Sequence, residues 1–390
     1  MSVIRLHILA IPHTITNQNF THCAFTNKVY HFCDMMTKQG YQVYHYGIES
    51  SNTKATKNID VLKLKEWGKL RHQSLKFLNP QLTDDEITKK LIDKKTFIGD
   101  IANIETPLYK TFNKRLIKKL KENYRSTETD IVCLPFGKAH LEAINSLNVV
   151  FCESGIGYNG SFCNYRIYES NAWLNFTNGI DNNNYPSHYN FVANNYYDMD
   201  EWTYNEPTTQ IIGFFGRICN TKGITIFVEI AKKYPNIKFV ICGQGDSSLY
   251  LLNDNIEYKE PICGKERNKF LGSLTAIICP SLFLEPWCNT SVEAQLCGTP
   301  VISTYHGAFS ENIENYKTGL LCHTLSDYCV GIDKALSGYF DRKYISERAK
   351  RLYSIENIGK TYDYIFKSIM DIHNGNNGWY SENKHIEKLF

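Results

Sequence analysis

Short apolar runs alternate with amphipathic segments through the second half of the chain. Runs of strand length occur at Ile211–Phe215, Lys238–Cys242, Ile256–Lys259, Thr275–Cys279, Val301–Thr304 and Gly319–His323. Segments with helical spacing lie at Gly223–Lys233, Lys265–Ser273 and Thr290–Cys297, and helical spacing resumes from Ser326 to Ile372. Because alternating strands and helices build a parallel sheet covered by helices, this pattern predicts a doubly wound α/β domain.

The first half is less regular but begins in the same way. An amphipathic helix, Ala24–Gln39, ends at Gly40, a typical helix C-cap. Buried strands are predicted at Val3–Ala10, Tyr41–Tyr46, Asp130–Pro135 and Asn148–Cys152. Lys-rich helical segments fill the stretch from about residue 62 to 125. A strand–helix–strand unit starts a parallel sheet, so we expect a second α/β domain at the N-terminus.

Composition excludes several classes of protein. A chain of 390 residues can bury two cores, and a net charge of +3 gives no reason to expect nucleic-acid binding. The 13 cysteines are odd in number and mostly lie in apolar runs, which indicates reduced thiols. No apolar run reaches the roughly 20 residues of a membrane span, and the first run is too short for a signal peptide. We therefore expect a cytoplasmic protein.

The stretch from Cys279 to Pro300 carries the clearest chemistry. Glu285 lies on the loop that leaves a predicted strand, and Glu293 lies one turn into the next predicted helix. In an open α/β sheet ligands bind outside the carboxyl ends of the strands, where helix N-termini attract anions. Two carboxylates there suggest a ligand with a negative group and hydroxyls, such as a sugar nucleotide. The alternative is a surface acid followed by an acid that the helix dipole favours.

Two cations bracket the loop after the first strand of the same domain. Arg217 follows that strand, and Lys222 directly precedes the next helix. Such a pair can neutralise a diphosphate and stabilise a leaving group that gains negative charge. Two solvated surface cations would give the same pattern, and only the combination with the two glutamates favours a site.

A glycine-rich turn, Cys242–Asp246, follows the next strand. It lacks the third glycine of a dinucleotide-binding fingerprint, and the chain's first strand-to-helix turn, Ile11–Asn19, contains no glycine. An NAD-dependent enzyme is therefore not expected.

Four motifs occur in order: GFFGRICNTKG, ICGQGD, CPSLFLEPWCNTSVEAQLCGTPVIS and HGAFSENI. Together they resemble the nucleotide-sugar-binding domain of retaining family-4 glycosyltransferases of the GT-B fold, over residues 210–325. The resemblance implies two Rossmann-like doubly wound domains facing each other across a cleft. It also implies a hexosyltransferase-type enzyme that moves a sugar from a UDP- or GDP-sugar to a glycan, lipid or small-molecule acceptor. Front-face attack and a covalent intermediate are both compatible with retention.

The resemblance also assigns roles to residues. Arg217 and Lys222 would hold the donor diphosphate, Glu285 the sugar hydroxyls and Glu293 the ribose hydroxyls, with Arg217, Lys222 and Glu285 as the catalytic set. Further donor-binding positions are Gly216, Gly243, Tyr258, Pro261, Ile262, Trp287, Cys288, Asn289, Thr290, His306 and Gly307. The family usually has Phe-Gly in place of Trp287-Cys288. Because the two cations can take the leaving-group charge, and no Asp-x-Asp motif ends a strand, we expect no metal or other cofactor.

The N-terminal half resembles the acceptor domain of such enzymes less closely. The Gly-Gly loop after the first strand is absent, and the usual histidine of this domain is not evident. The pattern ESGIGY…RIYESNAW is similar to a subgroup of bacterial-type members. We expect the acceptor side to include His13, Thr14, Glu153, Tyr158 and Arg166. For His13 the alternative is a hydrogen-bonded loop histidine.

These assignments give the domain boundaries. Residues 1–195 form the acceptor-binding domain with the Lys-rich insertion, and 196–207 the linker. Residues 208–365 form the nucleotide-sugar-binding domain, and the helix and tail at 366–390 cross back to the first domain. The basic amphipathic segment Thr111–Arg125 suits either peripheral membrane contact or, the interpretation we favour, a solvated helix over a core.

Two other functions fit the same motifs. A sugar-nucleotide epimerase or a phosphorylase of the same fold would turn over its substrate without a separate acceptor. A non-catalytic sugar-nucleotide-binding protein would bind the donor without hydrolysing it.

Overall fold

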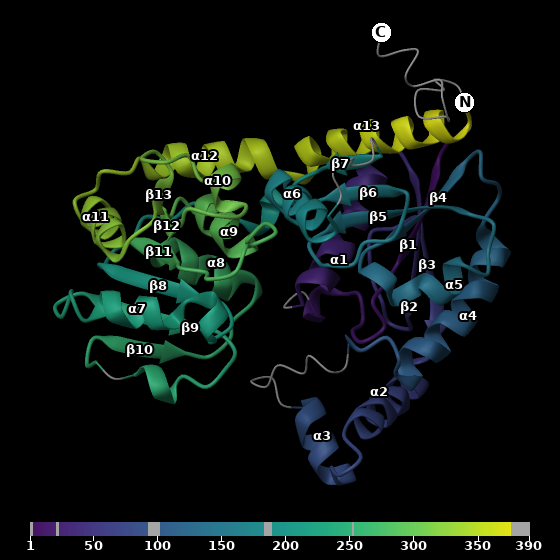
Figure 1. Ribbon diagram of the computed structural model, residues 1–390, viewed down its shortest axis with the longest axis horizontal. Coiled ribbons are helices and arrows are strands. Elements are labelled where there is room, and N and C mark those ends of the chain that lie inside the picture. Colours follow the sequence, from purple (N-terminus) through teal and green to yellow (C-terminus); the bar gives the residue numbers. More distant parts are fainter. Residues whose placement is uncertain (1–2, 21–22, 93–101, 183–188, 252, 376–390) are drawn as a thin grey trace.

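The computed structural model describes residues 3–20, 23–92, 102–182, 189–251 and 253–375, which form two α/β domains side by side (Figure 1). Each domain contains one parallel sheet, of seven strands in the first and six in the second. This confirms the predicted pair of doubly wound domains. Part of the predicted Lys-rich insertion and most of the predicted C-terminal tail lie outside the described residues.

The sheet of the first domain has the order β3-β2-β1-β4-β5-β6-β7. Its strands are β1 Arg5–Leu9, β2 Gln42–Ile48, β3 Lys57–Leu62, β4 Asp130–Leu134, β5 Val150–Ile156, β6 Tyr165–Tyr168 and β7 Asn190–Val192. Its helices are α1 Ala24–Lys38, α2 Leu64–Leu78, α3 Asp84–Ile92, α4 Pro107–Asn123, α5 Leu141–Ile144 and α6 Asn171–Ile180. The sequence did not predict β3, β6 or β7, of which β3 and β7 are the edge strands.

The sheet of the second domain has the order β10-β9-β8-β11-β12-β13. Its strands are β8 Ile211–Phe215, β9 Lys238–Cys242, β10 Ile256–Lys259, β11 Ala276–Cys279, β12 Val301–Thr304 and β13 Gly319–Cys322, so all six predicted strands are confirmed. The helices of this half are α7 Ile224–Ala231, α8 Gly264–Ser273, α9 Asn289–Leu296, α10 Phe309–Asn312, α11 Leu325–Leu336, α12 Arg342–Tyr353 and α13 Ile355–His373.

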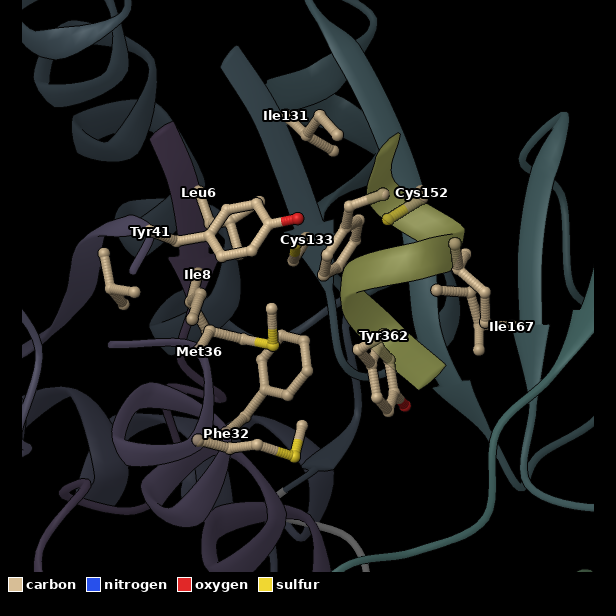
Figure 2. Packing of buried hydrophobic residues seen from close by; sticks show 14 of the residues in the cluster. Leu6, Ile8, Phe32, Met36, Tyr41, Ile131, Cys133, Cys152, Ile167 and Tyr362 are labelled. Carbon is tan, nitrogen blue, oxygen red and sulfur yellow. The ribbon is translucent and has the colours of Figure 1, made fainter. Parts of the chain in front are cut away.

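Helix α13 leaves the second domain and packs on the first (Figure 1). Its buried side chains belong to the same hydrophobic core as β1, β4 and α1, and Figure 2 shows Tyr362 among Phe32, Met36 and Cys152. The Phe32 and Tyr362 rings meet edge to face, with centroids 4.9 Å apart. The buried side of the helix begins at its first residue, Ile355, so the chain crosses back before residue 366, the start expected from the sequence.

The chain thus passes between the domains twice, and the two passages are bonded to each other. The Tyr197 N–H donates to the Tyr353 carbonyl over 2.9 Å, and the Ile355 N–H donates to the Tyr197 carbonyl over 3.0 Å. Because each passage hydrogen-bonds the other, neither is a free linker.

Helix α4 contains most of the basic segment that suited either a membrane surface or a core. Its apolar side chains, Leu108, Phe112, Leu116 and Leu120, are fully buried against the sheet, which confirms the helix over a core. Among the residues that the structure describes, no helix is long and apolar enough to span a bilayer. All 13 cysteines are free thiols.

We predict that Phe366→Ala destabilises the first domain by about 3–5 kcal/mol, because the ring is fully buried in that core. Urea denaturation followed by tryptophan fluorescence would measure the change. Tyr364→Ala on the same helix is the matched control, since Tyr364 is 70% exposed. Equal effects of the two substitutions would show that α13 does not belong to the core of the first domain.

Candidate active site

Arg217, Lys222 and Glu285 meet where the strand order of the second sheet reverses. Strands β8 and β11 are neighbours, with β9 and β10 beyond one and β12 and β13 beyond the other. In open α/β sheets, ligands bind at the carboxyl ends of the strands where the strand order reverses in this way. Arg217 and Lys222 lie on the first loop and Glu285 on the second.

Lys222 and Glu285 form a largely buried ion pair. The Lys222 Nζ lies 2.6 Å from Glu285 Oε1, which also accepts a hydrogen bond of 2.5 Å from the Ser281 hydroxyl. Burial lowers the pKa of Lys222, but the charges of Glu285 and Cys288 and the hydrogen bond to Glu285 together outweigh burial, and the net pKa is raised. Arg217 has a smaller opposing effect on this pKa, although its own side chain is exposed. Lys222 is therefore a cation at neutral pH.

Two glycines fix the backbone on either side of this pair. Gly223 has φ +72°, and a Cβ atom on it would lie 1.9 Å from the Pro280 carbonyl oxygen. Gly307 has φ +71°, and a Cβ atom there would lie 2.9 Å from the Glu285 nitrogen. Only glycine combines a left-handed conformation with such a close approach. The backbone next to Lys222 therefore packs closely against the backbone of Pro280, and the backbone of Glu285 packs closely against that of Gly307.

Glu293 is buried inside the same region on α9. Its carboxylate lies 3.3 Å from Arg267 Nη1, and the Arg267 guanidinium lies over the Trp202 ring at 5.2 Å from its centroid. Burial raises the pKa of Glu293, and the charge of Arg267 acts against burial. The sequence predicted the helix that carries Arg267 but gave no signal that this arginine faces Glu293.

The loop between Glu285 and α9 has an unusual backbone. Cys288 has φ 63° and ψ 81°, a left-handed conformation that costs a residue with a Cβ atom roughly 1–2 kcal/mol. The resemblance led us to expect glycine at this position, and the left-handed turn forms here with cysteine. Trp287 is buried, and its indole N–H donates to the Tyr197 hydroxyl over 3.2 Å. The pKa of Cys288 is raised mainly by a hydrogen bond with Cys279 and, to a smaller extent, by burial.

The other predicted donor positions lie at the same edge of the sheet. The Tyr258 hydroxyl donates to the Gly243 carbonyl over 3.2 Å, which joins the exits of β9 and β10. Asn289 accepts hydrogen bonds through Oδ1 from Asn195 at 3.0 Å and from Tyr197 at 2.8 Å. The remaining positions follow the strands β8, β10, β11 and β12: Gly216, Pro261, Ile262, Thr290 and His306.

Two residues that we expected on the acceptor side, His13 and Thr14, follow β1. The His13 Nδ1 lies 2.9 Å from the Tyr109 hydroxyl, and its Nε2 lies 3.7 Å from the Cys23 sulfur. Burial, with a smaller effect of Arg71, lowers the pKa of His13 to about 4, so its ring is neutral at pH 7. Thr14 is buried, with its hydroxyl 2.5 Å from the hydroxyl of Thr26.

Glu153 lies inside the structure. The sequence placed the end of its strand at Cys152, but β5 continues to Ile156 and carries Glu153 into the core. Its carboxylate accepts hydrogen bonds of 2.9 Å from the N–H groups of residues 162 and 163 and one of 3.1 Å from the Tyr158 hydroxyl. The Arg166 Nε donates to the Cys163 carbonyl over 2.6 Å. Glu153, Tyr158 and Arg166 thus shape one loop of the first domain, where we expect the acceptor.

The sequence did not single out Lys28 as a site residue. Lys28 and Glu169 form a buried ion pair, each with 8% of its side chain exposed, and Lys28 also donates to the Gly155 carbonyl over 2.9 Å. The pair joins α1 to the exits of β5 and β6. The sequence could have indicated this pair, because Lys28 lies on the buried side of the predicted helix Ala24–Gln39.

A groove of about 840 Å³ runs along the exposed side of α4 and contains six cations: Lys63, Lys110, Lys114, Arg115, Lys118 and Lys119. Four of them have acidic partners, among them Lys63, which pairs with Glu49 at 2.9 Å. Arg115 pairs with Glu66, Lys110 with Glu105 at 3.1 Å and Lys119 with Glu122 at 3.5 Å. The groove is therefore less basic than its lysines suggest.

Comparisons with known proteins relate the second domain to glycosyltransferases. Residues 200–352 match the family model described as glycosyl transferases group 1. An uncharacterized glycosyltransferase of Methanocaldococcus jannaschii is 28% identical over 180 residues, which are 42% of this chain and 46% of that protein. A D-inositol 3-phosphate glycosyltransferase of Paenarthrobacter aurescens is 30% identical over 145 residues, 33% of this chain and 35% of its own. The chain thus spans less than half the length of these two relatives.

Solved structures match nearly the whole chain. AviGT4, a glycosyltransferase involved in avilamycin A biosynthesis, has a TM-score of 0.63 at 14% identity, covering 95% of this chain and 98% of its own. Anabaena HepE in complex with UDP-glucose has a TM-score of 0.62 at 12% identity, covering 94% of this chain and 100% of its own. At this identity the likeness shows the fold. The chain therefore has the GT-B fold, and its second domain carries the sequence pattern of glycosyl transferases group 1.

Proposed function

We propose that this protein is a retaining glycosyltransferase that moves a sugar from a UDP- or GDP-sugar to a glycan, lipid or small-molecule acceptor. The family match of the second domain supports transfer of a sugar. The HepE structure, described as a complex with UDP-glucose, supports a nucleoside diphosphate sugar as donor. The second domain would bind the donor, and the first domain would bind the acceptor.

The observation that carries the proposal is the Lys222–Glu285 pair at the point where the strand order reverses. In the reaction, the bond between the anomeric carbon and the phosphate oxygen breaks, and its electron pair stays with the diphosphate. The acceptor oxygen bonds to the anomeric carbon and loses its proton. Lys222 and Arg217 would stabilise the charge that develops on the diphosphate, which a fixed cation does well in a site that excludes water.

The two glutamates would have separate tasks. Before the donor binds, Glu285 forms an ion pair with Lys222 and accepts a hydrogen bond from the Ser281 hydroxyl. Donor binding would turn Lys222 toward the diphosphate and leave the Glu285 carboxylate for sugar hydroxyls. Glu293, oriented by Arg267, would accept the ribose hydroxyls.

Two further points belong to the proposal. Transfer would proceed without a metal ion, because Arg217 and Lys222 together can neutralise the departing diphosphate. Contact with a membrane through residues 111–125 would be electrostatic, since the apolar side of α4 faces the core.

Replacing Lys222 with alanine should reduce kcat about 100- to 1,000-fold, because one cation is lost from the transition state. Release of the nucleoside diphosphate from UDP-glucose or GDP-mannose would measure the effect. Lys232→Ala is a matched control, as Lys232 is an exposed lysine of the same domain that pairs with Glu229 at 2.5 Å. A loss of less than about tenfold for Lys222→Ala would contradict its role.

Glu285→Gln should reduce transfer sharply and leave binding of UDP or GDP nearly unchanged, because a neutral amide accepts from the sugar hydroxyls more weakly than a carboxylate and the nucleotide contacts remain. Isothermal titration calorimetry with the bare nucleotide and a transfer assay would separate these effects. Glu257→Gln, which breaks an exposed pair with Lys238 at 2.7 Å, is the control. Loss of nucleotide binding together with activity would assign Glu285 a structural role instead.

A further inference from the structure

The first turn of helix α6, in the first domain, is held by a carboxylate of the second domain. Glu311 of α10 accepts through Oε1 from the Ala172 N–H over 2.7 Å. Its Oε2 accepts from the Asn171 N–H over 3.1 Å and from the Asn171 side-chain amide over 3.2 Å. Three donors of one domain thus converge on a single side chain of the other.

These bonds complete the N-terminus of α6. A helix leaves its first four N–H groups without helical partners. In α6, the Leu174 N–H donates to the Ser170 carbonyl over 3.1 Å as the first helical bond, and the Ser170 hydroxyl accepts from the Trp173 N–H over 3.1 Å. The first two, on Asn171 and Ala172, are those that Glu311 accepts. A carboxylate is favoured there because the helix dipole and charge-assisted hydrogen bonds act together.

The same turn also holds the loop that carries Glu285. The buried Ser170 hydroxyl donates to the Pro286 carbonyl over 2.6 Å. Pro286 follows Glu285 directly, and the Glu285 carbonyl accepts from the Ala308 N–H over 3.1 Å at the start of α10. The loop after β11 and the start of α10 are thus hydrogen-bonded to each other. Through Pro286 and Glu311, both are also attached to one turn of α6.

We propose that one set of hydrogen bonds between the domains, which we call the interdomain fastener, couples the Glu285 loop to the first domain. The bonds join Ser170, Asn171 and Ala172 of the first domain to Pro286 and Glu311 of the second. Glu311 and Ser170 are then positioning residues: they hold the loop with Glu285 toward the domain that presents the acceptor. The catalytic part of this inference rests on the proposed function. The coupling itself rests on the hydrogen bonds alone.

Hydrogen–deuterium exchange of the full chain tests the coupling without an assay of activity. In Glu311→Ala, the amides of Asn171 and Ala172 should exchange about tenfold faster, because their acceptor is lost, and in Glu311→Gln, which keeps one acceptor oxygen without the charge, they should exchange faster by a smaller factor. The peptide covering residues 280–290 should also exchange faster. Glu311→Asp, which keeps the charge, should restore part of the protection. Glu314→Gln is the matched control, since Glu314 pairs with Lys317 and Arg348 inside the second domain.

Steady-state release of UDP from UDP-glucose, and of GDP from GDP-mannose, tests the positioning role. Glu311→Ala should lower kcat about tenfold and leave KM within about twofold, because the nucleotide contacts are intact. Unchanged exchange in α6, or faster exchange in α6 with no change in residues 280–290, would overturn the fastener. Unchanged kcat would overturn the positioning role. The predicted exchange in a protein that releases no nucleotide would support the fastener and contradict the proposed function.

Discussion

Burial of α13 in the core of the first domain is the constraint on which the arrangement of the molecule depends. The helix begins in the second chain segment that connects the two domains. This segment is hydrogen-bonded to the first connecting segment through Tyr353 and Tyr197. With both passages fixed, the loops after β6 and β7 contact the loop after β11, through Ser170 with Pro286 and Asn195 with Asn289. The carboxyl ends of the two sheets therefore come together.

Ion pairs with little exposure to solvent gather in this region, and stability alone does not explain them. Removing a charge from water costs several kcal/mol, and well-packed apolar residues often stabilise a fold as much as a buried pair. Lys222–Glu285, Arg267–Glu293 and Lys28–Glu169 nevertheless lie at or near strand exits. Binding of a charged, hydroxylated ligand, as we propose, would account for the first two pairs. The third holds the backbone at the exits of β5 and β6 in the first domain.

The sequence predicted the second domain well because its strands are continuous apolar runs, buried on both faces of a parallel sheet. It missed β3, β6 and β7 because short, partly exposed strands near a sheet edge carry no such run. The charged residues at strand exits were predictable from motif spacing. Their partners were not, since Arg267 and Ser281 reach Glu293 and Glu285 only through the packing of separate elements. The burial of Glu153 and the left-handed turn at Cys288 depend on backbone geometry that residue type does not specify.

A crystal structure of the protein with UDP-glucose or GDP-mannose tests the central claim most directly. We expect the diphosphate between Arg217 and Lys222, the ribose hydroxyls on Glu293, and Glu285 separated from Lys222 and hydrogen-bonded to the sugar. A nucleotide bound away from the exits of β8 and β11, or a Lys222–Glu285 pair that stays intact beside the bound donor, would contradict it.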